Sequence, residues 1–141
     1  MPIPAIRFRV DFGRRQAVGP GKIALLERIG QTGSLSQAAR DLHMSYRRAW
    51  LLLESLNVSF RERVAVSSKG GRGGGGARLT VFGRHLISVY REFELQMQTR
   101  AARTFRAIAG EARVARGGAA GVKRRPRFGA AAAPVRRLQD R

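Results

Sequence analysis

The chain of 141 residues contains no cysteine, so neither a disulfide framework nor a thiolate metal site can form in it. Its only histidines are His43 and His85, which are too few for a histidine-rich metal site. Acidic residues are also scarce, nine in all; Glu92 and Glu94 fall on different faces of one predicted helix, and no nucleophile has a convincing histidine base. We therefore expect no metal ligands, no catalytic residues and no enzymatic activity.

Long apolar runs are missing as well. No window approaches the ~18 apolar residues of a membrane span, and the N-terminal MPIPAIRFRV lacks the apolar core of a signal sequence. We therefore expect a cytoplasmic, nucleoid-associated protein with no membrane contact.

Positive charge, by contrast, is in excess: the chain has 28 Lys and Arg against nine acidic residues, and its net charge is +19. Such a surplus attracts polyanions, which makes nucleic acid the first partner to consider and an anionic membrane the second.

The N-terminal third of the chain predicts a strand and a helix. Residues 6–12, IRFRVDF, alternate between apolar and polar side chains as in a half-buried strand. Gly19, Pro20 and Gly21 mark a turn, after which a helix is predicted over residues 21–29 with Gly30 as its end.

Residues 32–57, TGSLSQAARDLHMSYRRAWLLLESLN, predict two short helices joined by a tight turn. Ser34 and Gln37 form a capping-box pattern for the first helix. His43 falls where the turn needs a residue that tolerates positive φ, and Ser45 is a suitable cap for a second helix from Tyr46 to about Asn57. This arrangement is typical of a helix-turn-helix.

On the second helix, a rotation of 100° per residue separates an apolar face from a basic one. The basic face carries Arg47 and Arg48, whereas Tyr46 and Trp50 lie on the border. For Trp50 we favour burial over contact with bases. The apolar face comprises Ala49, Leu52, Leu53 and Leu56.

Two short apolar segments, 64–66 and 77–79, predict a hairpin with a glycine-rich tip, which after a helix-turn-helix is a wing. Thr80 can cap a long helix whose apolar residues recur every three or four positions as far as Ile108. At ~1.5 Å per residue that helix reaches roughly 40 Å, so its stripe projects beyond the domain and suits a second copy of the chain, although it could instead fold back. The predicted dimer interface is Phe82, Leu86, Val89, Phe93, Met97 and Phe105.

Overall, these elements predict a mainly α fold with a small β-hairpin, as a winged helix-turn-helix followed by a long dimerisation helix. We assign residues 1–109 to this domain. Residues 110–141 contain nine Lys or Arg and few bulky aliphatic residues, so they are predicted to be a flexible basic tail.

Two stretches resemble the DNA-binding half of the ModE family of molybdate-responsive regulators, which is related to the LysR-type winged-helix domain. They are GKIALLERIGQTGSLSQAARDLHMSYRRAWLLLESLN and KGGRGGGGARLTVFGRHLI, with SY-x-x-AW and LT-x-x-G as their most specific parts. The resemblance covers about residues 5–105. It implies dimerisation through the N-terminal strand and the last helix, with residues 45–57 in the major groove and the wing on the backbone or in the minor groove.

ModE proper continues into oxyanion-binding domains, whereas this chain ends in its Ala/Arg/Gly tail. We therefore expect no molybdate-binding domain and no cofactor here, and the regulated genes need not concern molybdenum. The predicted partners are double-stranded DNA, a second copy of the chain and, as a further possibility, a separate effector-binding protein.

Within the predicted site, Arg47 and Arg48 could read guanine edges, and the wing around residues 67–77 could hold phosphates through Lys69, Arg72 and glycine N–H groups. The full set of expected DNA contacts is Ser34, Ser36, Ser45, Tyr46, Arg47, Arg48, Trp50, Lys69, Arg72 and Arg78. The preferred function is a sequence-specific transcriptional regulator. The alternatives are a non-specific architectural DNA-binding protein and an accessory module that pairs with a separate effector-sensing protein.

Overall fold

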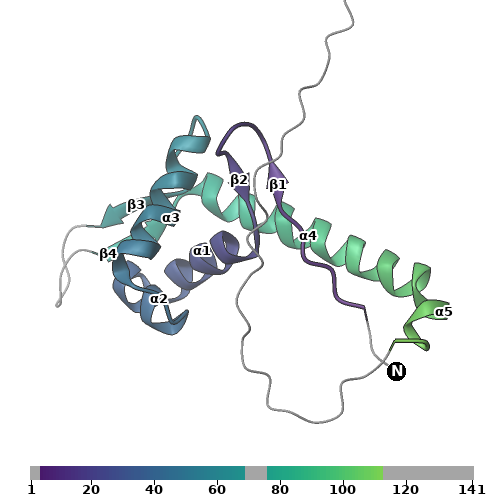
Figure 1. Ribbon diagram of the computed structural model, residues 1–141. Coiled ribbons are helices and arrows are strands. Elements are labelled where there is room, and N and C mark those ends of the chain that lie inside the picture. Colours follow the sequence, from purple (N-terminus) through teal and green to yellow (C-terminus); the bar gives the residue numbers. More distant parts are fainter. Residues whose placement is uncertain (1–3, 69–75, 113–141) are drawn as a thin grey trace, which may run out of the picture.

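The computed structural model describes residues 4–68 and 76–112, which form a helical domain with two small antiparallel strand pairs (Figure 1). The fold is the predicted winged helix-turn-helix followed by a long helix. Residues Lys69 and Arg72 and most of the tail, 113–141, lie outside the described residues.

The N-terminal strand is shorter than predicted. Only β1, Val10–Asp11, forms a ladder, pairing with β2, Ala17–Val18, a strand that the sequence did not predict. The preceding residues run extended beside a helix, where Tyr90 Oη donates to the carbonyl of Phe8 at 3.0 Å. Further along, the backbone N–H of Ile6 donates to Gln98 Oε1 at 2.9 Å. Side chains of the helix thus satisfy backbone groups that a neighbouring strand would otherwise bind.

Helix α1, Pro20–Thr32, continues past the predicted end at Gly30. Gly33, with φ of 66°, ends the helix instead, and its N–H donates to the carbonyl of Ile29 at 2.8 Å. Gly30 lies inside the helix, at the point where Leu79 packs against it. A Cβ on Gly30 would lie 2.9 Å from Leu79 Cδ1, which is closer than side chains normally approach. The glycine marks a close contact rather than a helix end.

Helices α2, Leu35–Asp41, and α3, Tyr46–Ser59, form the helix-turn-helix as predicted. Ser34 Oγ accepts from the N–H of Gln37 at 3.1 Å, and Ser45 Oγ accepts from that of Arg48 at 3.1 Å. The turn contains His43 at a φ of 54°, in the predicted left-handed conformation. The core that joins α1, α2 and α3 is apolar and fully enclosed; its largest side chains are Ile23, Leu25, Leu26, Ile29 and Leu56.

The predicted hairpin is present as β3, Ala65–Ser68, and β4, Gly76–Leu79, in antiparallel register from Ala65 opposite Leu79 to Ser68 opposite Gly76. Two contacts fix it to the domain. Asn57 Oδ1 on α3 accepts from the N–H of Val64 at 2.9 Å, and the N–H of Ala77 donates to the carbonyl of Gly33 at 2.9 Å. The wing is therefore attached to both the second helix of the motif and the end of α1.

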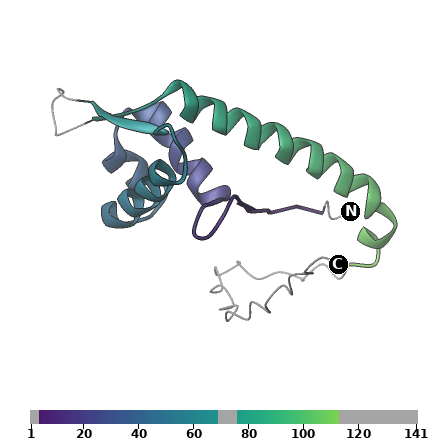
Figure 2. The same cartoon turned by 90° about the horizontal axis from the view of Figure 1, so that it is seen from above.

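Helix α4, Val81–Thr104, begins at its predicted cap, where Thr80 Oγ1 accepts from the N–H of Gly83 at 3.0 Å. The helix does not continue unbroken to Ile108: Phe105 separates it from the short α5, Arg106–Ala109. Its first half packs on the domain through Phe82, Leu86 and the buried Tyr90, a residue that the predicted stripe omitted. Its second half projects beyond the domain, and among the described residues the extended N-terminal segment runs beside it (Figure 2).

Candidate nucleic-acid interface

The beginning of α3 presents hydroxyl and cationic groups to solvent. Ser45 is exposed and Ser34 is half-buried, and each hydroxyl already accepts a capping hydrogen bond from the backbone. A serine hydroxyl that accepts in this way still has its own hydrogen to donate, for example to a phosphate oxygen at a helix N-terminus. Ser36, in the first turn of α2, is exposed, as is Ser45.

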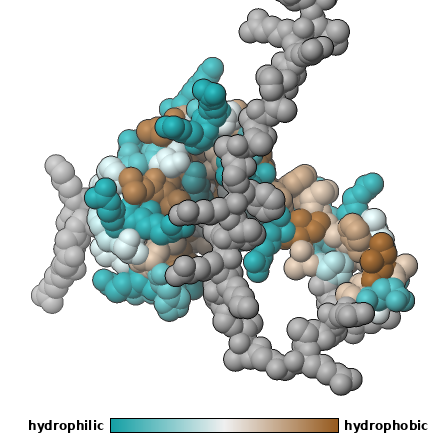
Figure 3. All heavy atoms as spheres, viewed as in Figure 1, coloured by the Kyte–Doolittle hydropathy of each residue, from teal (hydrophilic) through white to brown (hydrophobic). Residues whose placement is uncertain are grey.

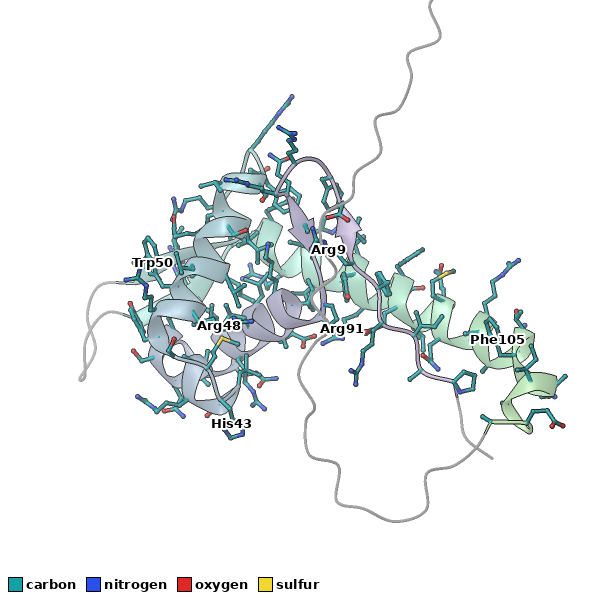
Figure 4. All side chains as sticks on the ribbon, in the orientation of Figure 1. Arg9, His43, Arg48, Trp50, Arg91 and Phe105 are labelled. Carbon is teal, nitrogen blue, oxygen red and sulfur yellow. The ribbon has the colours of Figure 1, made fainter. Side chains whose placement is uncertain are left out.

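Arg47 and Arg48 are both exposed in the first turn of α3. Among the described residues, neither guanidinium takes part in an ion pair, so both retain their full hydrogen-bonding capacity for a ligand. They do not point the same way: at 100° per residue Arg48 lies about 160° from Trp50, whereas Arg47 lies about 60° from it. Figure 4 shows Trp50 directed toward the hairpin and Arg48 away from it.

Tyr46 and Trp50 are 55% and 47% exposed, so the expectation that Trp50 is buried was wrong. Both side chains face the hairpin without being covered by it. They border a small depression of about 90 Å³ whose opposite side is formed by Val66, Ser67 and Gly76 of the wing strands. The helix-turn-helix and the wing therefore meet at one depression, and Arg47 follows Tyr46 in the first turn of α3, outside the lining of that depression.

The remaining predicted contacts are distributed less evenly. Arg78 is exposed on β4 but borders a different depression, together with Gly33 and Arg84, so the structure does not bring it to Tyr46 and Trp50. Lys69 and Arg72 belong to the undescribed tip of the wing, and their role stays a prediction.

The acidic group closest to this surface is already neutralised. Glu54 on α3 accepts from Arg63 at 3.0 Å and from Asn57 Nδ2 at 3.2 Å. This pairing holds the segment after α3 against the helix and leaves the cations at the beginning of α3 without an acidic competitor. Of the charged residues on α3, Glu54 is thus paired whereas Arg47 and Arg48 are not, among the residues described.

Two residues that position the site, Asn57 and Lys22, were not among the predicted ones. Asn57 is the one polar side chain on the buried face of α3 among the described residues, and its amide oxygen accepts from the N–H groups of Val64 and Ala65. Lys22 links α1 to the far side of α3, donating to Ser55 Oγ at 2.9 Å, and burial together with nearby Arg9 lowers its pKa. An asparagine in an otherwise apolar stripe is the pattern that could have indicated the first of these contacts.

An ion-pair network away from the site joins the long helix to α1. Arg91 on α4 binds Glu27 on α1 with two contacts of 2.7 Å and Glu94 with one of 2.6 Å. The hydrogen bonds from Arg91 lower the pKa of Glu27, against the opposing effect of partial burial. The Arg91–Glu27 pair thus adds to the packing of Phe82, Leu86 and Tyr90 in holding α4 against the domain.

Two classes of site find no support in the described part of the chain. No group of three or more His, Cys, Asp or Glu residues is arranged there to hold a metal ion. Likewise, none of the helices described has the length and apolar character needed to cross a membrane.

A capped helix pair, a tight turn and a hairpin attached to the second helix together define a winged helix-turn-helix, a class in which the second helix and the wing face the same side. No family model matches the chain. Among curated proteins, it is 36% identical over 93 residues to "Molybdenum transport protein ModE" of Azotobacter vinelandii, covering 66% of this chain and 34% of that protein.

It is also 42% identical over 77 residues to "Transcriptional regulator ModE" of Yersinia pestis, covering 55% of this chain and 29% of that protein. A third relative, "DNA-binding transcriptional dual regulator ModE" of Escherichia coli (strain K12), is 41% identical over 71 residues, covering 50% of this chain and 27% of that protein. The chain thus contains a winged helix-turn-helix domain of the ModE type. It matches about a third of the length of these curated relatives.

Proposed function

We propose that this chain is a sequence-specific DNA-binding transcriptional regulator, with α3 in the major groove and the wing on the DNA backbone. The observation that carries the proposal is the depression in which Tyr46 and Trp50 of α3 face the strands of the wing. Arg47 follows Tyr46 in the first turn of α3 and has no ion pair among the residues described. One duplex can then touch both elements. The printed names of the relatives, which include a DNA-binding transcriptional regulator, support the same function.

The two elements would do different work. Arg47 is placed to donate two hydrogen bonds to a guanine in the major groove, and Tyr46 and Trp50 offer apolar contact to a thymine methyl group or a sugar. The wing, including Lys69 and Arg72, would bind phosphates, which positions the protein without reading sequence. Arg48 points away from the wing and is better placed for a phosphate than for the same base pairs.

We further propose that the regulator acts as a homodimer. An apolar groove of about 270 Å³ runs between the N-terminal segment and α4, where Phe12, Val89 and Phe93 are 57%, 53% and 43% exposed. Beyond it, further apolar side chains lie on the projecting half of α4 (Figure 3). A two-fold partner that covers both would place two copies of α3 on successive half-sites.

Selection of bound fragments from random DNA, followed by competition with unselected DNA, tests this function. A regulator should prefer its selected site by roughly a thousandfold or more, whereas an architectural protein would show little preference. If no preference emerges, the proposed function is wrong. Co-purification with an effector-binding protein would identify an accessory module instead.

Variants then separate the two elements. Arg47→Ala should weaken binding to the selected site by about 1–3 kcal/mol and relax preference at one base pair. Lys69→Ala with Arg72→Ala should weaken binding to all sequences alike and lower the salt slope by about two. Identical behaviour of the two variants across sequences would refute this division of work.

A further inference from the structure

A second group of cations lies beside α3, on the side away from the wing. It comprises Arg14 and Arg15 in the turn between β1 and β2, and Arg61 in the segment after α3; all three are exposed. Figures 1 and 2 both place α3 between the hairpin of the wing and the β1–β2 turn. We call Arg14, Arg15 and Arg61 the turn patch.

The turn patch is built on rigid supports. Within the turn, the N–H of Phe12 donates to the carbonyl of Gln16 at 2.8 Å, and the N–H of Gln16 donates to the carbonyl of Gly13 at 3.2 Å. Phe12 then packs edge-to-face on Phe60, with ring centroids 5.4 Å apart. This contact joins the segment that carries Arg14 and Arg15 to the segment that carries Arg61.

The charges of the turn patch are not used within the described fold. The neighbouring cations are paired, Arg9 with Asp11 at 2.8 Å and Arg63 with Glu54 at 3.0 Å, whereas no ion pair involves the three patch arginines among the residues described. Glu62, which is exposed, is the acidic residue in the same segment and leaves the patch with a surplus of two positive charges.

Arg15 has an uncommon conformation for its type. Its φ is 62°, a left-handed value that favours glycine or asparagine. The tip of the turn thus carries a cation at a position where a glycine would be less strained. Non-glycine residues that keep such conformations are found disproportionately at functional sites.

The geometry of α3 indicates what this patch could meet. With 14 residues at about 1.5 Å each, α3 is about 21 Å long, whereas the major groove is about 12 Å wide. If the first turn of α3 points into the groove, its last turn emerges over the sugar–phosphate backbone. The turn patch lies at that end, and Figure 2 shows the β1–β2 turn on the same side of the molecule as α3, opposite α4.

We propose that Arg14, Arg15 and Arg61 form a second phosphate-binding site, which holds the DNA backbone on the side of α3 opposite the wing. The proposal rests on the DNA binding proposed above for α3. The wing and the turn patch would then grip the two backbones that border one major groove. The site contributes affinity and orientation but no base reading.

The test compares three full-length variants on a duplex that the unmodified protein selects from random DNA. Arg14→Gln/Arg15→Gln/Arg61→Gln removes the patch charges, and the matching lysine triple variant keeps them. The control, Arg100→Gln/Arg103→Gln/Arg106→Gln, removes three exposed charges from the far end of α4 and α5. Circular dichroism and sedimentation verify folding and association state, and fluorescence anisotropy gives Kd from 50 to 200 mM salt.

The glutamine triple variant should lower the slope of log K against log salt by about 2.7, which is about a 40-fold change across this salt range. Base preference should not change, and hydroxyl-radical protection should be lost on the side of the groove away from the wing. The lysine variant should keep the slope, because counterion release depends on charge. The control should alter the slope much less.

An unchanged slope in the glutamine variant, or an equal change in the control, would overturn the turn patch while leaving DNA binding by α3 intact. If the unmodified protein bound no duplex, the proposed function would fail first, and this site with it. Arg15→Gly supplies an independent readout: it should preserve or raise the melting temperature while lowering the salt slope by about 0.9. A purely structural arginine would show no change in slope.

Discussion

Gly83 lies where the first turn of α4 crosses the beginning of the wing, and replacing it with alanine should destabilise the fold. A methyl group there would overlap the carbonyl oxygen of Val64 and lie 2.9 Å from its carbonyl carbon. That carbonyl also accepts from the N–H of Thr80 at 3.0 Å, so it cannot turn aside without losing a hydrogen bond. The substitution therefore forces backbone against backbone.

The magnitude follows from two opposing effects. Alanine is favoured over glycine in a helix by about 1 kcal/mol, because glycine loses more backbone freedom on folding. Overpacking a tight contact typically costs about 1–3 kcal/mol, and this one lacks a flexible side chain that could move aside. Because backbone meets backbone, we expect the upper end of that range, and hence a net loss of roughly 2 kcal/mol in the free energy of unfolding.

The measurement is urea and thermal unfolding followed by circular dichroism, on Gly83→Ala and on a matched control. Gly21→Ala makes the same chemical change in the first turn of α1, where a Cβ would meet nothing within 4 Å. The control should be more stable by about 0.4–1 kcal/mol. For a domain of this size, each kcal/mol corresponds to about 4–8 °C in melting temperature, so the two variants should shift in opposite directions.

A Gly83→Ala protein as stable as the unmodified one would refute the close approach of α4 to β3. The same contact between Gly83 and Val64 should also help to hold the wing in place, because Val64 immediately precedes β3. A less stable variant whose DNA binding at low temperature is unchanged would refute that role.

Three other substitutions test separate parts of the fold by the same unfolding measurements. Asn57→Leu should cost about 1–3 kcal/mol, because it leaves buried N–H groups at the beginning of β3 without an acceptor; a smaller loss would mean that water replaces the amide. Ser45→Ala should cost about 1 kcal/mol through the lost cap of α3, and an unchanged midpoint would contradict the capping role. Glu27→Gln should reduce the dependence of stability on pH. Since Arg91 lowers the folded-state pKa of Glu27, its stabilisation is present above the ordinary glutamate pKa of about 4.3 and disappears as pH falls through the lower folded value. The difference in stability between the two proteins should therefore shrink from pH 6 to pH 3, and a constant difference would show that the charge of Glu27 is irrelevant.

Much of the helix-turn-helix could be predicted because its determinants are local. Ser34, His43 and Ser45 each act on backbone groups within three residues, so their positions alone fix where α2 and α3 begin and turn. The same holds for Thr80 at the beginning of α4. The effect of a cap or a turn residue can therefore be predicted from the few residues around it.

The predictions that were wrong concern contacts between distant segments. Gly30 looked like a helix end, but its role depends on Leu79, 49 positions later. The extent of β1 depends on Tyr90 and Gln98, which bind the N-terminal segment from more than 80 positions away. Trp50 was expected to be buried, but its exposure depends on how closely the wing approaches α3, and the wing leaves it half exposed. The periodicity of apolar residues along the chain does not show which distant segments come into contact, so it could not predict these features.

The structure also gives a physical reason for the LT-x-x-G sequence that follows the wing. Leu79 occupies the space beside Gly30, Thr80 caps α4 and donates to the carbonyl of Arg63 at 2.6 Å, and Gly83 lets α4 pass against Val64. Asn57 binds the same segment from α3. The short segment 63–65 is thus fixed by α3 on one side and α4 on the other, so the wing cannot move relative to α3 without breaking several contacts together. Contacts of this kind keep strands β3 and β4 at a constant distance from the first turn of α3, which the proposed division of work requires if backbone contacts are to determine which bases Arg47 would reach.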